Sequence, residues 1–181
     1  MRKITNSELN RPSAELFATM QRIPVVVVLD NVRSAQNIGA FFRTGDAFAI
    51  EKVMLCGITA TPPSRDIHKS ALGAELTVGW EYYPTTAECV AALKAQGYTP
   101  LAIEQVEGAV MLDELEVDTT KKYALVFGNE VEGVDQAVVD MATVRRQGGL
   151  AVGDAAEDGV AGVKDGQTQH EEGDCKGDEG G

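Results

Sequence analysis

The stretch VVVVLDNVRSAQNIGAFFRT, residues 25–44, decides the fold that this sequence predicts. It opens on a continuous run of β-branched and aliphatic residues, which is typical of a parallel strand buried on both faces. A polar loop follows, and from Asn37 onward the apolar residues Ile38, Phe41 and Phe42 fall near one face of a helix. A buried strand, a loop and an amphipathic helix form the repeating unit of an α/β fold.

The same alternation recurs further along the chain. Strand-like runs are found at residues 52–56, 77–83, 100–104 and 123–127. Helical segments are expected at residues 66–75, 86–96, 111–115 and 134–142. The pattern predicts an α/β domain in which helices flank a mainly parallel sheet, and in such folds ligands bind at the carboxyl ends of the strands.

The composition changes near Thr143. Residues 145–181 hold 10 of the 19 glycines, no aromatic residue and a single leucine. A Gly-rich, acidic segment of this kind cannot bury enough apolar surface to offset its ordering entropy. We therefore expect a folded domain over residues 1–144 and a disordered tail over residues 145–181.

The charge is unevenly distributed. The net charge of −12 argues against a protein that binds nucleic acid mainly by electrostatics. Residues 1–72, however, carry 9 basic and 6 acidic groups, a balance of +3, whereas residues 73–181 carry 7 and 22, a balance of −15. An RNA-facing surface, if present, is expected on the N-terminal half, and the alternative is that these charges are only solvated surface.

Composition also bounds location and metal content. No stretch approaches the length of a membrane span, and the first residues lack the apolar run of a signal peptide, so a cytoplasmic protein without membrane contact is expected. The cysteines and histidines show no metal-ligand spacing, and we expect no metal site. These residues are Cys56, Cys89, Cys175, His68 and His170.

Two segments have the residues for chemistry. In the first, backbone donors at the start of the predicted helix favour an anion such as a phosphate, Asn37 is a plausible cap, and Arg43 lies within two turns of that helix start. The alternative for Arg43 is a surface ion pair with Asp46 or Glu51. The second segment, ALVFGNEVEGVD at residues 124–135, has two carboxylates that suit ribose hydroxyls or a cationic centre. Its alternative is an ordinary strand-helix turn with solvated acids.

Together the two segments resemble a known family. The pattern Asn-x5-Asn-x-Gly-x3-Arg-Thr, residues 31–44, resembles motif 1 of the SpoU family within the SPOUT methyltransferases, and FGNEVEG, residues 127–133, resembles motif 2. KSALGA, residues 69–74, and AIEQ, residues 102–105, also look like family positions. The resemblance covers residues 4–141, and the order of the two motifs disfavours an unrelated nucleotide-binding α/β domain.

The resemblance implies a function and a set of site residues. Members transfer a methyl group from S-adenosylmethionine to a ribose 2′-hydroxyl in tRNA or rRNA, work as homodimers and form a deep trefoil knot. By position, Arg43 would contact the RNA phosphate and help to deprotonate the 2′-hydroxyl, and Asn37 and Glu130 would organise that site. The cofactor-binding positions would be Ile103, Phe127, Gly128, Asn129 and Gly133. The RNA-binding candidates on the net positive half are Arg22, Arg33, Arg43, Arg65 and Lys69.

The sequence departs from the family pattern in two places. Ser34-Ala35 stands where many members have Asp-Pro, which is a loop change. After Met141, where motif 3 with its Ser-Leu-Asn should begin, the chain instead reads ATVRRQGG, residues 142–149. We interpret this change as an altered 3′ coding end, such as a frameshift. It would remove the final strand, the knot, half of the cofactor pocket and a dimer-forming helix. The alternative function is a catalytically inactive relative that binds RNA or a partner.

Overall fold

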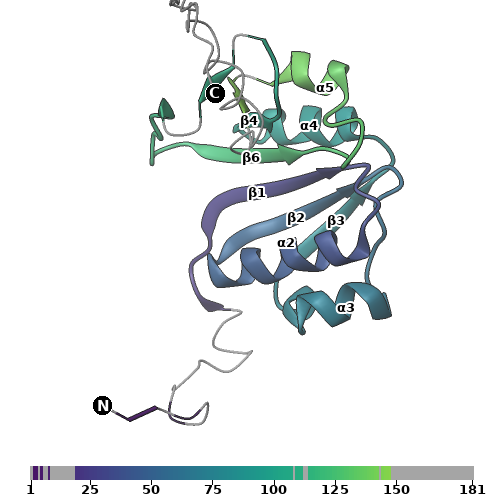
Figure 1. Ribbon diagram of the computed structural model, residues 1–181. Helices are drawn as coiled ribbons and strands as arrows, with labels where there is room; N and C mark the ends of the chain where they lie inside the picture. Colours follow the sequence, from purple (N-terminus) through teal and green to yellow (C-terminus); the bar gives the residue numbers. More distant parts are fainter. Residues whose placement is uncertain are drawn as a thin grey trace, which may run out of the picture. The chain divides into compact units, whose positions relative to one another are not determined.

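A computed structural model describes the domain that the sequence predicts (Figure 1). The described residues are 2, 3, 5, 8, 19–107, 109–111 and 114–142, together with the backbone of 144–147. The chain divides into two units, Met1–Gly148 and Gly149–Gly181. The second unit, and with it the predicted tail beyond residue 147, lies outside the described residues.

The domain is built on one parallel sheet. Its strands are β1 (Ile23–Asp30), β2 (Ile50–Cys56), β3 (Gly79–Tyr83), β4 (Tyr98–Ile103), β5 (Val110–Met111), β6 (Lys122–Phe127) and β7 (Val144–Gln147). They lie in the order β3-β2-β1-β6-β4-β7-β5, and every pair of neighbours is parallel. The predicted fold class is therefore confirmed, and the carboxyl ends of the strands meet at one edge of the sheet.

Helices cover both faces of the sheet. They are α2 (Ala35–Ala47), α3 (Arg65–Ala71), the short 3-10 helix η2 (Ala74–Leu76), α4 (Thr86–Ala95) and α5 (Gln136–Met141). Figure 1 shows α2 and α3 on one side of the strands and α4 and α5 on the other, in agreement with two separate hydrophobic clusters. Each α-helix begins after a polar side chain that accepts a backbone N–H, which satisfies a donor that the helix itself leaves unpaired.

The central strand β1 is buried on both faces. Val26 and Val28 belong to the cluster under α4 and α5, whereas Val27 and Leu29 belong to the cluster under α2 and α3. Successive strand residues face opposite sides of a sheet, so a strand between two helical layers needs apolar residues at every position. This explains the unbroken run of four valines, residues 25–28, within β1.

Two segments predicted to be helical differ in the structure: one helix is shorter than predicted, and the other segment begins in a strand. The segment at residues 66–75 ends as an α-helix at Ala71, because Leu72 and Gly73 take left-handed backbone conformations with φ of 55° and 93°. The expected helical turn at residues 111–115 is wrong at its start, since Met111 lies in strand β5. A strand of two residues is too short to show a period in the sequence.

The C-terminal end of the domain also differs from expectation. Residues 144–147 form strand β7, which is inserted between β4 and β5. The composition predicts a tail from residue 145 onward, whereas residues 145–147 belong to this strand. Among the described residues, no helix is long and apolar enough to cross a membrane.

Candidate functional site

The first part of the site is the turn from β1 into α2. Ser34, not Asn37, is the N-cap of α2: the Ser34 hydroxyl oxygen accepts the backbone N–H of Asn37 at 3.2 Å. The expectation that Asn37 caps the helix is therefore wrong. Because the cap is supplied by Ser34, the carboxamide of Asn37 is left to project from the first turn toward the neighbouring loop.

The two predicted motifs meet through Asn37 and Glu130. The Asn37 carboxamide donates to Glu130 Oε1 at 2.9 Å, although 93 residues separate the two positions. The same carboxylate accepts the backbone N–H groups of Ser34 at 3.3 Å and Arg33 at 3.5 Å. Four donors therefore act on Glu130 when its own backbone N–H is included.

These donors favour the ionised form of Glu130. The pKa of its carboxyl lies below the ordinary value of 4.5. The largest cause is the backbone N–H of Glu130 itself, and the Asn37 amide and the N–H groups of Arg33 and Ser34 act in the same direction. Partial desolvation opposes the shift. The exposed carboxylate is thus a negatively charged acceptor at the edge of the sheet.

The loop that follows β6 is closed on itself. Asn129 and Gly133 exchange two backbone hydrogen bonds of 2.9 Å, and the Asn129 side-chain oxygen accepts the N–H groups of Val131 at 2.8 Å and Glu132 at 3.3 Å. A Cβ on Gly128 would lie 2.0 Å from the carbonyl carbon of Gly133, so the chain folds back this tightly only with glycine there. The loop thus presents a fixed arrangement of backbone groups.

A buried polar cluster ties the two loops together. The Asn129 carboxamide donates to the backbone oxygen of Asn31 at 2.9 Å. Asp30, only 1% exposed, accepts the side-chain amide of Asn31, the hydroxyl of Thr86 and the backbone N–H of Asp135. Asp30 therefore joins the ends of β1, β3 and β6, and buried polar groups with complete pairing specify one arrangement.

Sequence reasoning missed the role of these anchoring residues. Asp30 and Asn31 both belong to the quoted stretch at residues 25–44. The sign of a structural role was the position of Asp30, a carboxylate directly after a strand of apolar residues. Glu104 was also quoted without a role, and its carboxylate accepts the backbone N–H of Val134 at 2.8 Å and lies against Gly133. Only the folded chain shows that these three side chains hold the loops in place.

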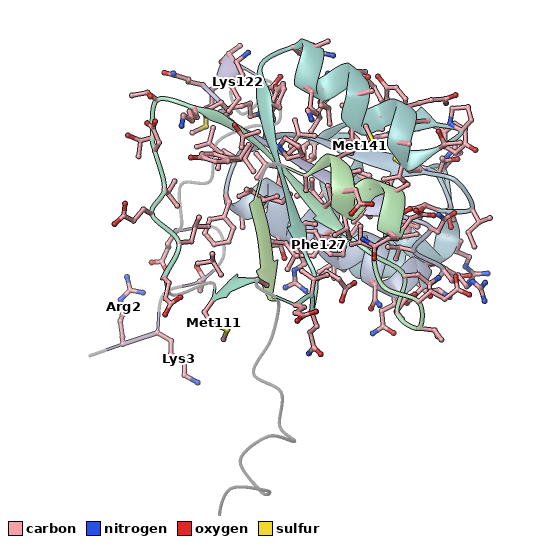
Figure 2. All side chains as sticks on the ribbon, turned by 90° about the horizontal axis from the view of Figure 1, so that it is seen from above. Arg2, Lys3, Met111, Lys122, Phe127 and Met141 are labelled. Carbon is pink, nitrogen blue, oxygen red and sulfur yellow. The ribbon has the colours of Figure 1, made fainter. Side chains whose placement is uncertain are left out.

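The predicted cofactor positions gather at one edge of the sheet. Ile103 and Phe127 are partners in the register of β4 and β6, and Arg146 of β7 is aligned with Ile103 on its other side. Figure 2 shows β6 running from Lys122 at one end to Phe127 at the other, which places Phe127 at the carboxyl end of the sheet. The side chain of Asn129 is bonded both to Asn31 and within its own loop, so the backbone is what this loop offers to a ligand.

Arg43 lies apart from Asn37 and Glu130, on a later turn of α2. It is exposed and lines a groove of about 840 Å³ between α2 and α3, across from Lys69. The alternative of an ion pair is not supported: Asp46 accepts the hydroxyl of Thr77 and Glu51 that of Tyr98. In the part of the chain that the structure describes, neither acid pairs with Arg43.

The other cationic candidates have different surroundings. Lys69 forms an exposed ion pair with Asp66 at 2.8 Å. Arg33 and Arg65 are exposed, one beside Glu130 and one at the start of α3. Arg22 instead donates to the backbone oxygen of Thr77 at 3.1 Å from a partly buried position. Over the described ranges, no cluster of three or more His, Cys, Asp or Glu side chains could hold a metal ion.

Comparisons with known proteins point to one family. The SpoU rRNA Methylase family matches residues 24–147, about two thirds of the chain and the whole sheet with both motifs. A tRNA (guanosine(18)-2′-O)-methyltransferase of Thermus thermophilus is 29% identical over 136 residues, which cover 75% of this chain and 68% of that protein. The enzyme of the same name from Escherichia coli is 28% identical over 65% of this chain and 50% of its own length.

A solved structure agrees in fold. The AdoMet-bound rRNA methyltransferase from Sinorhizobium meliloti superposes with a TM-score of 0.65 at 23% identity, covering 76% of this chain and 53% of that one. The chain thus spans about half the length of several of the proteins that it matches. The match over residues 24–147 includes both motif loops and strand β7, and this chain belongs to the SpoU rRNA methylase family.

Proposed function

We propose that this chain transfers a methyl group from S-adenosylmethionine to a ribose 2′-hydroxyl of tRNA or rRNA. The observation that carries the proposal is the 2.9 Å contact between Asn37 and Glu130, which joins the two family motifs into one site. Family membership and the names of the relatives support the reaction class. The alternative, an inactive relative that binds RNA or a partner, rests on the departure from motif 3 after Met141.

The edge of the sheet fits the cofactor. S-adenosylmethionine supplies an electrophilic methyl group on a cationic sulfonium. Glu104, Glu130 and Glu132 make the surrounding loops acidic, which suits a cation, and Ile103, Phe127 and Gly128 present backbone at adjacent strand ends. In this proposal Asn129 and Gly133 act by keeping the loop closed. The fit rests on the chemistry of these groups, which are acidic side chains and the backbone of partly buried residues at the strand ends.

Arg43, Asn37 and Glu130 have separate roles in the proposed reaction. A neutral 2′-hydroxyl is a weak nucleophile, so it has to lose its proton to solvent as its oxygen attacks the methyl carbon, while the carbon–sulfur bond breaks and the neutral thioether product leaves. The guanidinium of Arg43 binds the adjacent phosphate and stabilises the negative charge that develops on the oxygen. Glu130, positioned by Asn37 and the backbone N–H groups beside it, accepts a hydrogen bond from the ribose and fixes its orientation.

RNA binding is proposed for the groove between α2 and α3. Arg43 and Lys69 face each other across it, and Arg33 and Arg65 extend the positive charge along the same side of the sheet. Arg22 was a candidate as well, and its bond to Thr77 makes it the weakest of the five. A cytoplasmic homodimer is also proposed, on family resemblance, and light scattering of the purified chain tests the dimer.

The test is methyl transfer in vitro. The purified chain is incubated with methyl-labelled S-adenosylmethionine and, separately, with unmodified tRNA and rRNA. We expect label in one RNA class as a 2′-O-methyl nucleotide after nuclease digestion. Label in the base, or no transfer to either RNA class by a chain that binds RNA, would reject the proposal in favour of another reaction or the inactive relative.

A further inference from the structure

A second hollow lies on the other side of α3 from the Arg43 groove. Its volume is about 580 Å³, within the range of pockets that hold small ligands. Its lining comprises Arg65, His68, Glu75, Leu76 and Trp80 with the turn at residues 62–64. None of the contacts at the candidate catalytic site uses it.

Trp80 forms the aromatic wall of this hollow. It lies on β3, which is the edge strand of the sheet, and 36% of its surface is exposed. Residues of a strand alternate between its faces, so Trp80 is on the α3 side, whereas Tyr83 packs against the core cluster under α4. Across from Trp80, 81% of Leu76 is exposed. A large planar apolar surface is therefore accessible at this edge.

Positive charge borders the same hollow. Arg65 is exposed and lines it, and Lys69, one turn later on α3, is exposed in the Arg43 groove. The helix α3 thus contributes one cation to each hollow. The buried carboxylate of Glu75 also lines the hollow: one of its oxygens is bonded to His68, and the other, Oε2, has no hydrogen-bond partner among the described residues.

We propose that this hollow is a subsite for one unpaired RNA base, which stacks on Trp80 while its phosphate contacts Arg65. The inference rests on the proposed function, because it extends the RNA path from the Arg43 groove across α3. Single-stranded RNA is recognised by stacking of unpaired bases on aromatic side chains, with nearby cations holding the backbone. A hollow with one aromatic wall and one exposed guanidinium has both parts of such a site.

The test uses the fact that Trp80 is the only tryptophan of the chain. A single-stranded RNA hexamer of mixed sequence is titrated into the full chain. Binding is followed by the anisotropy of a label on the RNA and, separately, by tryptophan fluorescence. We expect quenching of Trp80 with the same midpoint as the anisotropy change, because a stacked base quenches the indole directly.

Variants separate stacking from charge. We expect Trp80→Ala to weaken hexamer binding by about 5- to 150-fold, the range for the loss of one stacked base, and Trp80→Phe to restore most of it. Arg65→Gln should weaken binding and reduce its salt dependence. The control is Val117→Ala, which shortens an apolar side chain that is 59% exposed outside the hollow and should bind like the unchanged chain. Circular dichroism checks that each variant folds.

Several outcomes would overturn the subsite. They are RNA binding without any change in Trp80 fluorescence, unchanged affinity of Trp80→Ala, equal quenching by an abasic hexamer, or no hexamer binding at all. If methyl transfer persists in any of these cases, the proposed function stands and only the subsite fails. If the hexamer quenches Trp80 but no RNA is methylated, the subsite stands and the catalytic proposal fails.

Discussion

Two parts of the same helix differ in how far their side chains are held. In the first turn of α2, Asn37 is fixed by a contact to Glu130, and the backbone beside it is bonded to the same carboxylate. Two turns later, Arg43 extends into a groove without a partner among the described residues. Hydrogen bonds within the protein define the first position, whereas the second is free to be defined by a ligand.

This difference indicates a division of labour. Groups that must be in place before substrate arrives are held by the fold, since preorganised dipoles need no rearrangement during reaction. A cation that binds a phosphate gains its partner only from the substrate, and an Arg paired internally would first have to break that bond. We infer that Asn37 and Glu130 fix the geometry of the site before the RNA binds, and that Arg43 becomes ordered only when it binds an RNA phosphate.

The largest expected effect is on catalysis by Arg43. Replacing Arg43 with Ala should lower the rate of methyl transfer by about 10²- to 10⁴-fold, the range for loss of one group that assists proton transfer. The melting temperature should not change, because Arg43 is exposed and forms no ion pair with the other described residues. Full activity of the Arg43→Ala variant would mean that Arg43 has no role in the reaction, and the proposed difference between Arg43 and Asn37 would be rejected. Arg43→Lys tests whether charge alone suffices, since Lys cannot form the paired hydrogen bonds of a guanidinium.

The next effect is on the stability of the closed loop. Gly128→Ala places a methyl group against the backbone of Gly133 and Val134, and should cost about 1–3 kcal/mol of unfolding free energy. Urea denaturation measures this loss. Gly97→Ala is the comparison: its Cβ would meet nothing within 4 Å, so only its left-handed φ of 86° is penalised. Equal losses in the two variants would mean that the close approach of the loop does not matter.

A smaller effect concerns the salt dependence of RNA binding. Neutralising Lys69, in the groove, should reduce the slope of log affinity against log salt by about one unit. Lys121 directly precedes Lys122, the first residue of β6, and so lies at the amino end of that strand; neutralising it should leave the slope unchanged. If neutralising Lys121 changed the slope more than neutralising Lys69, the RNA would not bind in the groove between α2 and α3.

The smallest effect is on the titration of Glu130. Asn37→Ala removes one donor, so the pKa of Glu130 should rise toward its ordinary value of 4.5. A depressed carboxyl pKa stabilises the fold above the unfolded value, and this contribution disappears as the pH falls through the folded value. The unchanged chain should therefore gain stability over the variant above about pH 4.5 and lose that advantage in stronger acid. NMR titration of the carboxyl carbon measures the shift.

Much of the fold was predictable because local patterns and buried strands agree. The run at residues 25–29 and the polar loop after it predicted β1 and α2, and the second motif predicted β6 with its loop. The family resemblance placed Asn37 and Glu130 in the same site but did not predict a hydrogen bond between them. No spacing in the sequence shows that the 93 residues between them bring these two side chains into contact.

What escaped prediction depends on tertiary pairing. Asp30 is a buried carboxylate that accepts from its neighbour Asn31, from Thr86 at the start of α4 and from the backbone of Asp135 before α5, and only the assembled sheet brings the last two to it. Ser34 and Asn37 are both capable helix caps, and the backbone conformation decides between them. Strands β5 and β7 are short and pair mainly with each other and β4, so neither has a strong local signal.

The position of β7 has a consequence for how the domain forms during synthesis. Strand β5 emerges from the ribosome well before β7, yet its partner in the sheet is β7, and β7 also covers the outer edge of β4. Until residues 144–147 arrive, β4 presents an open row of backbone donors and acceptors, which is the feature that lets nascent chains pair with one another. This edge of the sheet is covered only after β7 has been translated. In the interval between the synthesis of β4 and of β7, the nascent chain is therefore more prone to aggregation.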